Sequence, residues 1–316
     1  MSIGIALSPV ALGAAANAVD AAVSLGREAE AVGLASLWLG QTFSHDAIAV
    51  AGIVGREVPG LEVGTSVVPI IGRHPLLVAS QAQTAQAAAR GRFTLGIGLG
   101  AAAISGPAYG APDERPITRL REFITALRSV IGTGVAELRG ETITAVTPMP
   151  GAVAGARTDT AILVAAMGPQ ALRVTGELAD GTLPFLIGPA ALAEHVIAPL
   201  HAAAERAGRP RPRVAIAVPG VVTADLGAAR AAAAAQTAFY DTIPSYRRTV
   251  ELSGARAAAE LVVLGDEETV AARIAEYFDA GATDVIFTQT DLTTQADRRR
   301  TWRLLGELNR SRIKTA

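Results

Sequence analysis

Three glycines at alternate positions, Gly96, Gly98 and Gly100, close the apolar stretch that begins at residue 92. A glycine at the C-terminal end of a strand lets a planar ligand approach the backbone. The same letters would also suit a dinucleotide-binding turn in an open, doubly wound sheet. However, no helix opens directly at the glycines of LGIGLGAAAISG, and no acidic residue ends a strand about 20 positions later. The pattern therefore favours a platform for a flat ligand.

Metal and thiol chemistry find no support in the sequence. The chain has 0 Cys, which excludes a thiol nucleophile, disulfides and thiolate metal sites. The four histidines, His45, His74, His195 and His201, show neither HxH nor HExxH spacing. We therefore expect no metal site.

The glycines belong to a strand-helix-strand unit that spans residues 61–100. The first strand is rich in β-branched residues and ends at Pro69, which cannot donate to a ladder. Residues 75–89 are good helix formers, with Pro75 at a tolerated first position and Gly91 as the stop. Short connections make this a βαβ unit, so the two strands should be parallel neighbours.

Eight strands, each followed by helix, are expected along the chain. The strands are predicted at 3–7, 35–39, 61–69, 92–99, 160–166, 181–187, 213–218 and 283–288. The other helices are predicted at 14–32, 46–56, 117–131, 169–178, 189–207, 225–259 with a break near Pro244, 266–280 and 294–309, with Ser44 and Asp266 as N-caps. A loop is expected at 101–116, and an excursion around 135–160 should hold a hairpin with its turn at Arg139-Gly140.

This order predicts an α/β fold, a (β/α)8 TIM barrel that forms a single domain over residues 1–316. An open doubly wound sheet is the runner-up. Half of the residues are hydrophobic, which is ample for a large core. The formal net charge of -1 indicates no nucleic-acid partner. The absence of a basic leader and of a long uninterrupted apolar run predicts a cytoplasmic protein without a membrane span.

The C-terminal ends of the predicted strands carry apolar and neutral polar residues only. In a barrel these ends build the active site. They read Ser8-Pro9, Gly40-Gln41, Ser66 to Pro69, Leu99 to Ala101, Ala165 to Gly168, Leu186 to Gly188, Val218 to Gly220 and Thr288 to Thr290, without Asp, Glu, Lys or Cys. Such a mouth suits a bound organic cofactor that carries the chemistry. The helix that begins at Gly168-Pro169 offers free backbone N–H groups that would suit a phosphate.

Two long segments resemble the bacterial luciferase-like monooxygenase family. TSVVPIIGRHPLLVASQAQTAQAAARGRFTLGIGLG (Thr65 to Gly100) is similar to the family hallmark of an apolar strand, an R-H-P step, a helix and G-R-F-x-L-G-x-G-x-G. ILVAAMGPQALRVTGELADG (Ile162 to Gly181) resembles its second signature. The match spans most of the chain and is weakest at 135–160 and 225–260.

The resemblance implies a barrel that binds coenzyme F420, the preferred reading, or FMN. The implied cofactor-binding residues are Gly40, Ser66, Val67, Val68, Arg73, Gly98, Leu99, Gly100, Ala101, Ala166, Met167, Gly168 and Gln289. Of these, Ser66 to Val68 would lie under the ring, Gly98 to Ala101 along the tail, and Ala166 to Gly168 at the phosphate. A cis peptide bond between Ser66 and Val67 is also implied.

Two departures from the family pattern bear on the substrate. Sugar-oxidising members carry an acid and a histidine after the second strand, where this chain has Gly40 and Gln41. They also carry a carboxylate where this chain has Ala101. Because no base is present at these positions to accept a hydroxyl proton, reduction of an activated C=C or C=N bond is favoured, with the proton from solvent or from His45.

Several candidate residues also have a structural interpretation. His45 could be a solvent-facing residue, Arg73 and His74 could order a loop, and Asp180 could order a turn. His195 and His201 are expected at the surface, Gln289 and Thr290 could hydrogen-bond a ring carbonyl, and Tyr109 and Tyr246 could cover the substrate. The alternatives left open are an FMN-dependent monooxygenase with a partner reductase and a non-catalytic flavin-binding barrel. The Ala-rich helices at 225–260 could pack against a second copy in a homodimer or could simply coat the barrel.

Overall fold

The computed structural model describes residues 1–110 and 114–313, with the backbone alone for residues 102–105 and 313. Two compact units make up this chain. Unit 1 comprises Met1–Trp38, Leu183–Pro199 and the chain from Arg213 onward, and unit 2 comprises Leu39–Thr182 and Leu200–Pro212. The expectation of one domain over residues 1–316 stays a prediction.

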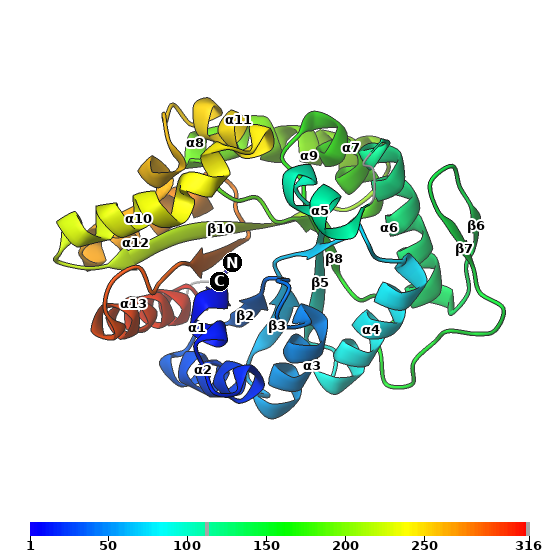
Figure 1. Ribbon diagram of the computed structural model, residues 1–316, viewed down its shortest axis with the longest axis horizontal. Helices are drawn as coiled ribbons and strands as arrows, with labels where there is room; N and C mark the ends of the chain where they lie inside the picture. Colours follow the sequence, from blue (N-terminus) through cyan, green and yellow to red (C-terminus); the bar gives the residue numbers. More distant parts are fainter. Residues whose placement is uncertain (111–113, 314–316) are drawn as a thin grey trace. The chain divides into compact units, whose positions relative to one another are not determined.

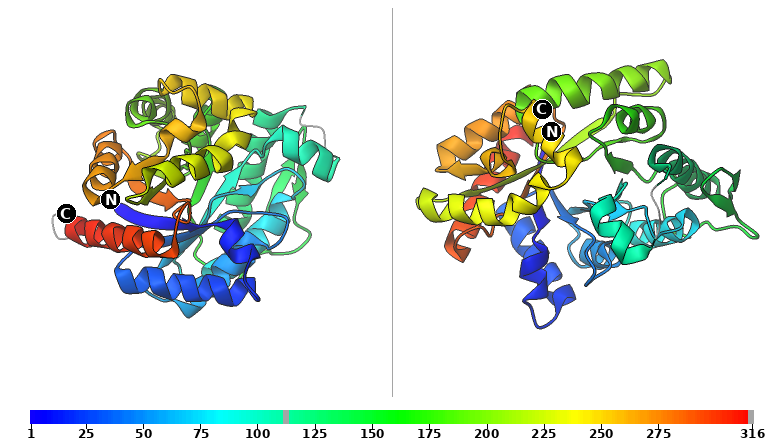
Figure 2. Two further views of the ribbon diagram at one scale, coloured as in Figure 1. Left: turned by 60° about the vertical axis from the view of Figure 1, so that its left-hand side comes forward. Right: turned by 45° about the horizontal axis from the view of Figure 1, so that its top comes forward.

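Unit 1 is built on parallel strands with buried apolar residues. β12 (Asp284–Thr288) lies between β1 (Ser2–Leu7) and β10 (Arg213–Val222), and β11 (Val263–Gly265) pairs with the end of β10. Residues 285–287 of β12 are fully buried. The helices are α1 (Pro9–Gly13), α2 (Ala18–Val32), α8 (Pro189–Leu192), the π-helix η1 (Ala193–Ile197), α10 (Leu226–Asp241), α11 (Pro244–Leu252), the 3-10 helix η2 (Ala258–Leu261), α12 (Glu267–Asp279) and α13 (Gln295–Ile313). Figures 1 and 2 show α12 and α13 packed beside each other.

Unit 2 repeats the same strand-helix alternation. Parallel strands β3 (Glu62–Thr65), β5 (Phe93–Gly98), β8 (Ile162–Ala165) and β9 (Gly181–Thr182) follow one another, and β4 (Val68–Pro69) also pairs with β5. The helices are α3 (Ala47–Glu57), α4 (Pro75–Ala88), α5 (Ala102–Tyr109), α6 (Pro116–Thr133) and α7 (Pro169–Leu178), while α9 (Ala198–Arg206) continues from η1. In Figure 1, α3, α4 and α6 cover the outer side of these strands.

The parallel pairing and the alternation of strand with helix confirm the predicted (β/α)8 fold class. β2 (Ser36–Leu39) and the helix boundaries at 117–131, 169–178 and 266–280 also agree with the sequence to within two residues. The antiparallel hairpin of β6 (Glu137–Arg139) and β7 (Thr144–Val146) confirms the excursion around 135–160. Within the described residues, no helix combines the length and the apolar character needed to cross a membrane.

Several boundaries were wrong for local reasons. The first long helix begins at Ala18, not at residue 14, because Asn17 caps it by accepting from the N–H groups of Val19 and Asp20. Asp46, not Ser44, caps α3. The strand expected at 61–69 is interrupted between β3 and β4, β9 is shorter than predicted, and the loop at 101–116 contains α5. β11 was not anticipated.

Candidate cofactor site

The C-terminal ends of β2 and β3 meet at a backbone junction in unit 2. The Ser66 N–H donates to the Leu39 carbonyl at 2.8 Å, and the Gln41 N–H donates to the Val67 carbonyl at 3.3 Å. The peptide bond between Ser66 and Val67 is cis, which confirms the prediction. Both residues are half-buried, so the junction is partly open to a ligand.

Gly98 continues this junction toward β8. It lies opposite Pro69 on one side and Ala165 on the other, and its carbonyl accepts from the Ile70 N–H at 2.8 Å. A Cβ atom at residue 98 would stand 2.9 Å from Cγ2 of Val67, so only glycine leaves the Val67 side chain in place. At Gly40 a Cβ atom would meet the Ser66 carbonyl oxygen at 3.4 Å. The fold thus brings four segments predicted to bind a cofactor to one strand-end edge.

The N-terminus of α7 stands at the end of β8. Its N-cap, Gly168, is extended and supplies no side-chain hydrogen bond. A Cβ atom added to Gly168 would meet nothing within 4 Å. The Ala166 N–H donates to the Val164 carbonyl, and the Ala166 carbonyl accepts from the Thr182 hydroxyl. The open, uncapped first turn therefore suits an anionic group, which the positive end of the helix dipole would attract.

The loop after β2 presents a buried, unpaired imidazole nitrogen. The Gln41 amide shapes the loop, because its Nε2 donates to the carbonyls of Thr42 and His45 and its Oε1 accepts from the Ala47 N–H. The Nδ1 of His45 lies 3.1 Å from the Ser44 hydroxyl. The Nε2 of His45 is fully buried and has no hydrogen-bond partner in the described part of the chain. An enclosed polar atom of this kind is costly to leave unpaired.

The Arg73-His74 step orders loops. The Arg73 guanidinium lies 3.5 Å from Oδ2 of Asp46. His74 caps α4 by accepting from the Leu76 N–H through Nδ1, and its Nε2 contacts the Thr144 carbonyl at 3.0 Å. Since Nδ1 accepts, Nε2 must carry the proton and donate to Thr144. A cofactor contact by Arg73 stays a prediction.

Three of the remaining candidates follow Gly98 directly, and one lies in unit 1. Leu99 is half-buried, Gly100 is exposed with φ of 84°, and Ala101 is the N-cap of α5. Gln289, after β12, has φ of 55° and a buried Oε1 without a partner among the described residues. The roles proposed for these four residues, and for Met167, stay predictions. Thr290 instead accepts from Nε1 of Trp302 at 2.9 Å.

The other polar candidates are Asp180 and His201 in unit 2 and His195 in unit 1. Asp180 accepts from the Ile162 N–H and pairs with Arg128 and Arg209, which confirms its structural role. The two histidines are half-buried helical residues. Burial, helped by the charge of Arg211, lowers the pKa of His201.

An aromatic pair in unit 2 joins Tyr109, which was a candidate from the sequence, to Phe43, which was not anticipated. The rings of Phe43 and Tyr109 lie 6.1 Å apart, and Tyr109 lies over Gly72. Phe43 is 73% exposed. In the sequence, the feature that could have pointed to Phe43 is its position between two polar residues on the loop after β2.

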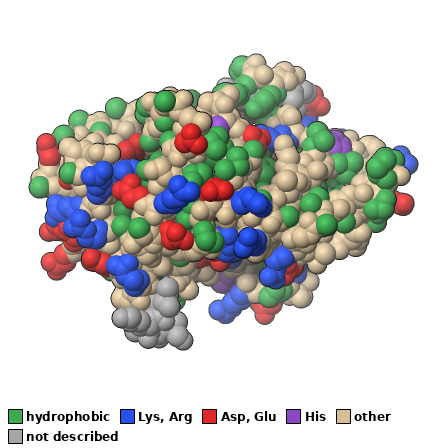
Figure 3. Space-filling view, turned by 90° about the horizontal axis from the view of Figure 1, so that it is seen from below, with side chains coloured by type: hydrophobic (Ala, Val, Ile, Leu, Met, Phe, Trp, Pro, Cys, Tyr) green, Lys and Arg blue, Asp and Glu red, His purple; other side chains and the backbone are tan. Residues whose placement is uncertain are grey.

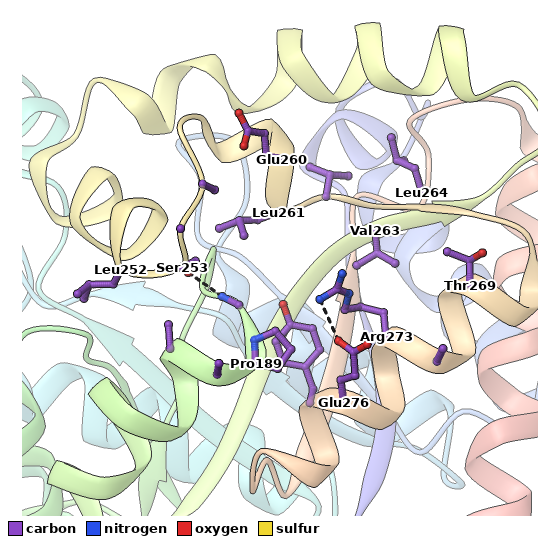
Figure 4. Close-up of a pocket in the computed structure, with 18 residues that line it drawn as sticks. Pro189, Leu252, Ser253, Glu260, Leu261, Val263, Leu264, Thr269, Arg273 and Glu276 are labelled. Carbon is purple, nitrogen blue, oxygen red and sulfur yellow. Dashed lines mark hydrogen bonds and ion pairs between the residues drawn. The ribbon is translucent and has the colours of Figure 1, made fainter.

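Unit 1 contains a cavity of about 750 Å³ (Figure 4). Its walls come from the start of α8, the end of α11, η2, β11 and α12, and Arg273 pairs with Glu276 at its edge. None of the predicted site residues lines it. On the face drawn in Figure 3, basic and acidic side chains are interspersed, without a single-sign area. Among the described residues, no group of three His, Asp or Glu side chains is arranged to hold a metal ion.

Known protein families and proteins share sequence with this chain. The family model described as luciferase-like monooxygenase matches residues 1–284. An uncharacterised protein of Mycobacterium tuberculosis is 30% identical over 76% of this chain and 72% of its own length. The 5,10-methylenetetrahydromethanopterin reductase of Methanolobus tindarius is 28% identical over 66% of this chain and 63% of its own length.

Two solved structures share the fold over nearly their whole length. An F420-dependent secondary alcohol dehydrogenase in complex with an F420-acetone adduct superposes with a TM-score of 0.78 at 17% identity, covering 96% of this chain and 97% of that one. The oxygenating constituent of 3,6-diketocamphane monooxygenase of Pseudomonas putida, in complex with FMN, gives a TM-score of 0.79 at 16% identity, covering 98% and 97%. At these identities the likeness shows the fold alone.

Proposed function

The chain belongs to the luciferase-like monooxygenase family, and we propose that within it the protein is an F420-dependent oxidoreductase. The proposed reaction is hydride transfer to an activated C=C or C=N bond of a small organic substrate. The observation that carries the proposal is the strand-end edge of unit 2, which combines neutral backbone surfaces with the unpaired Nε2 of His45. The sequence similarity to a methanopterin reductase supports the reductive direction.

The residues of unit 2 fit a flat cofactor with an anionic tail. Ser66, Val67 and Gly98 offer a surface without protruding polar side chains, on which a ring would rest. The uncapped first turn of α7 would hold the phosphate. When bound in its reduced form, F420 supplies a hydride and is thereby oxidised. The protein must supply the position of the substrate and one proton.

His45 is the proposed proton donor. Delivery of one hydride and one proton converts C=C into CH–CH, or C=N into CH–NH. In the proposed tautomer the Ser44 hydroxyl donates to Nδ1, and the proton of the neutral imidazole sits on Nε2, which has no partner among the described residues. After donation, the ring regains a proton from solvent. A histidine in this role contributes roughly 100- to 10,000-fold to the rate.

The cofactor is tested by fluorescence titration of the purified protein with oxidised F420 and, separately, with oxidised and reduced FMN. We expect micromolar binding of F420 and at least tenfold weaker binding of FMN, a gap of about 1.4 kcal/mol. Tight FMN binding with oxygen consumption would replace the proposal with an FMN-dependent monooxygenase. Cofactor binding without turnover of enones or imines would indicate a non-catalytic barrel, and binding of neither cofactor would refute the assignment.

The role of His45 is tested in the same preparation. His45→Asn should bind F420 within about threefold of the wild-type affinity and lose at least about 100-fold in kcat for an enone. His195→Asn, which alters a half-buried helical histidine of unit 1, is the matched control and should keep the wild-type affinity and the wild-type kcat. An H45N variant with undiminished kcat would assign the proton to solvent.

A further inference from the structure

The cavity of about 750 Å³ in unit 1 has no part in the proposed function (Figure 4). All of its walls belong to unit 1, because they come from residues 188–191 and from residues between 252 and 277. Pockets that bind small organic molecules have volumes of about 300–1,000 Å³ and mostly apolar walls with a few polar groups. The size of this cavity is therefore that of a small-molecule site. Its apolar walls include Ala191, Leu252, Leu261, Val263 and Leu264.

Hydrogen bonds fix the walls of the cavity relative to one another. The Tyr277 hydroxyl donates to the Ile187 carbonyl at 3.0 Å and joins α12 to the chain just before α8. The Gly188 N–H donates to the Ser253 hydroxyl at 2.8 Å and joins the same chain to the C-cap of α11. The Ser253 hydroxyl donates in turn to the Thr249 carbonyl at 2.7 Å. Because these bonds lie within the protein, the cavity is formed before any ligand binds.

The backbone around the start of α8 has two uncommon features. Leu186 has φ of 52°, a left-handed conformation that few residues other than glycine adopt. The π-helix η1 directly follows α8, whose first residues line the cavity. Strained residues and π-helical turns both occur frequently at functional sites. The cavity wall thus carries two local signs of function that are independent of its volume.

Arg273 is the polar residue that determines what the cavity can bind. Its guanidinium is always charged and offers five N–H donors in a planar fork. In Figure 4 it extends from α12 toward the centre of the lining residues. Nη1 lies 2.9 Å from Oε2 of Glu276, and the guanidinium has no other partner in the described part of the chain. Nε and Nη2 can therefore bind a second carboxylate through two parallel hydrogen bonds.

The other polar side chains of the lining already have partners in the protein. The hydroxyls of Ser253, Thr269 and Tyr277 all donate to protein oxygens. Glu260 accepts from a backbone N–H at 3.3 Å, and in Figure 4 its carboxylate points away from Arg273. Among the described residues, the side-chain donors that the cavity can offer to a ligand are those of Arg273.

We propose that the cavity binds a small organic molecule with one carboxylate on an apolar, aromatic or aliphatic body. The carboxylate binds Nε and Nη2 of Arg273, and the body packs against Leu261 and Val263. Glu276 competes with the ligand for the same guanidinium, so the two members of the ion pair affect the affinity in opposite directions. No residue predicted to bind F420 lines the cavity, so this is a second site.

The test is isothermal titration calorimetry of the full chain with 1-naphthylacetate and with 1-naphthylacetamide, which is uncharged and of similar shape. We expect micromolar binding of the acid and about tenfold weaker binding of the amide, because the amide lacks the charge-assisted pair. Arg273→Gln should weaken binding of the acid about tenfold and leave binding of the amide unchanged. Glu276→Gln should strengthen binding of the acid about threefold, since the competing charge is removed.

The ion pair between Arg247 and Glu251 supplies the matched controls. It also joins an arginine to a glutamate on a helix of unit 1, but neither residue lines the cavity. Arg247→Gln and Glu251→Gln should therefore bind the acid as the wild type does. All four side chains are about half exposed or more, so circular dichroism should show the same fold in all four variants.

Saturation with F420 should leave the affinity for the acid unchanged, and the titration is equally informative if F420 does not bind. No binding of the acid, equal binding of the acid and the amide, or wild-type affinity in R273Q overturns the proposal. Weaker binding of the acid by E276Q also overturns it, because the ion pair would then act as a unit and not as a competitor. Displacement of the acid by F420 overturns the assignment of a second site.

Discussion

Asp284, at the start of β12, offers a sharp test of what stabilises unit 1. Its carboxylate accepts from Nε of Arg213 at 2.6 Å and from Nη2 of the same guanidinium at 3.1 Å. The hydroxyls of Thr283 and Ser2 also donate to it. These contacts join the N-terminal ends of β1, β10 and β12, which are adjacent parallel strands. Asp284→Asn should keep the shape but lose the ion pair and one acceptor.

The size of the effect follows from burial. Asp284 is 10% exposed and Arg213 is 26% exposed at the side chain. Breaking a fully buried pair costs about 3–5 kcal/mol, because the remaining charge is left without compensation. Arg213 keeps some hydration, so we expect a loss of about 2–3 kcal/mol in the free energy of unfolding, on the scale of one or two charged hydrogen bonds. The corresponding fall in Tm is roughly 5 °C for a chain of this size.

The pH dependence has a definite sign. Burial alone would raise the pKa of Asp284, but the hydrogen bonds and charge of Arg213, with those from Ser2 and Thr283, outweigh it and hold the pKa below its usual value. The stabilisation is therefore present above the unfolded-state pKa of about 3.9 and is lost as pH falls through the folded-state pKa. Wild type and D284N should differ at pH 7 and converge toward pH 3.

Urea unfolding from pH 7 to pH 3, followed by circular dichroism, measures this difference. Asp159→Asn is the matched control, because Asp159 pairs with Arg157 at 2.7 Å but both side chains are at least 60% exposed. Water and salt screen such a pair, so its loss should leave the midpoint unchanged. A D284N midpoint equal to the wild type at pH 7, or a gap that stays constant to pH 3, would refute the reasoning.

Two further predictions concern unit 2. Gly98→Ala should weaken F420 binding about tenfold, because the new Cβ would stand 2.9 Å from Cγ2 of Val67. Gly132→Ala is the control and should bind F420 normally, because its new Cβ would meet no atom within 4 Å. Equal affinities of the two variants in the titration would contradict this reasoning. Glu122→Gln should speed hydrogen exchange at the amides of residues 141–143 by about tenfold, since the Glu122 carboxylate accepts from all three and from the Thr142 hydroxyl. Burial would raise the pKa of Glu122, but these hydrogen bonds lower it overall. The protection of the three amides should therefore be present near neutrality and lost on acidification. Unchanged exchange in E122Q would show that the hairpin is stable without the Glu122 carboxylate.

The elements with strong local signals were predictable from the sequence. Residues 117–131 carry a regular apolar stripe, and Asp266 stands where a cap is needed, so α6 and α12 were found. α5 was missed because it is short and contains Pro107, so its residues show no helical period. The apolar run at 61–69 reads as one strand, since nothing in residue type marks the interruption between β3 and β4.

The sequence was sufficient to predict which strand ends carry the candidate site, but not which side chains pair with one another there. Alternating glycines place Gly98 at a strand end, and the register then brings it beside Ala165. Arg73 is equally suited by type to a phosphate or to a carboxylate, and only the folded chain shows Asp46 beside it. In the same way, only the folded chain shows that the Gln41 amide binds the His45 carbonyl and the Ala47 N–H, and that Nε2 of His45 has no partner among the described residues.

The partners of the carboxylates in unit 2 narrow the possible chemistry. Asp46 caps α3 and faces Arg73, Glu122 holds the tip of the hairpin, and Asp180 is shared between two arginines. Each of these carboxylates already accepts hydrogen bonds or pairs with an arginine in the folded chain. Oxidation of an alcohol needs a base to take the hydroxyl proton, whereas reduction needs a donor. In the proposed reaction Nε2 of His45, which has no partner among the described residues, would be the donor, so we expect the protein to favour reduction over alcohol oxidation.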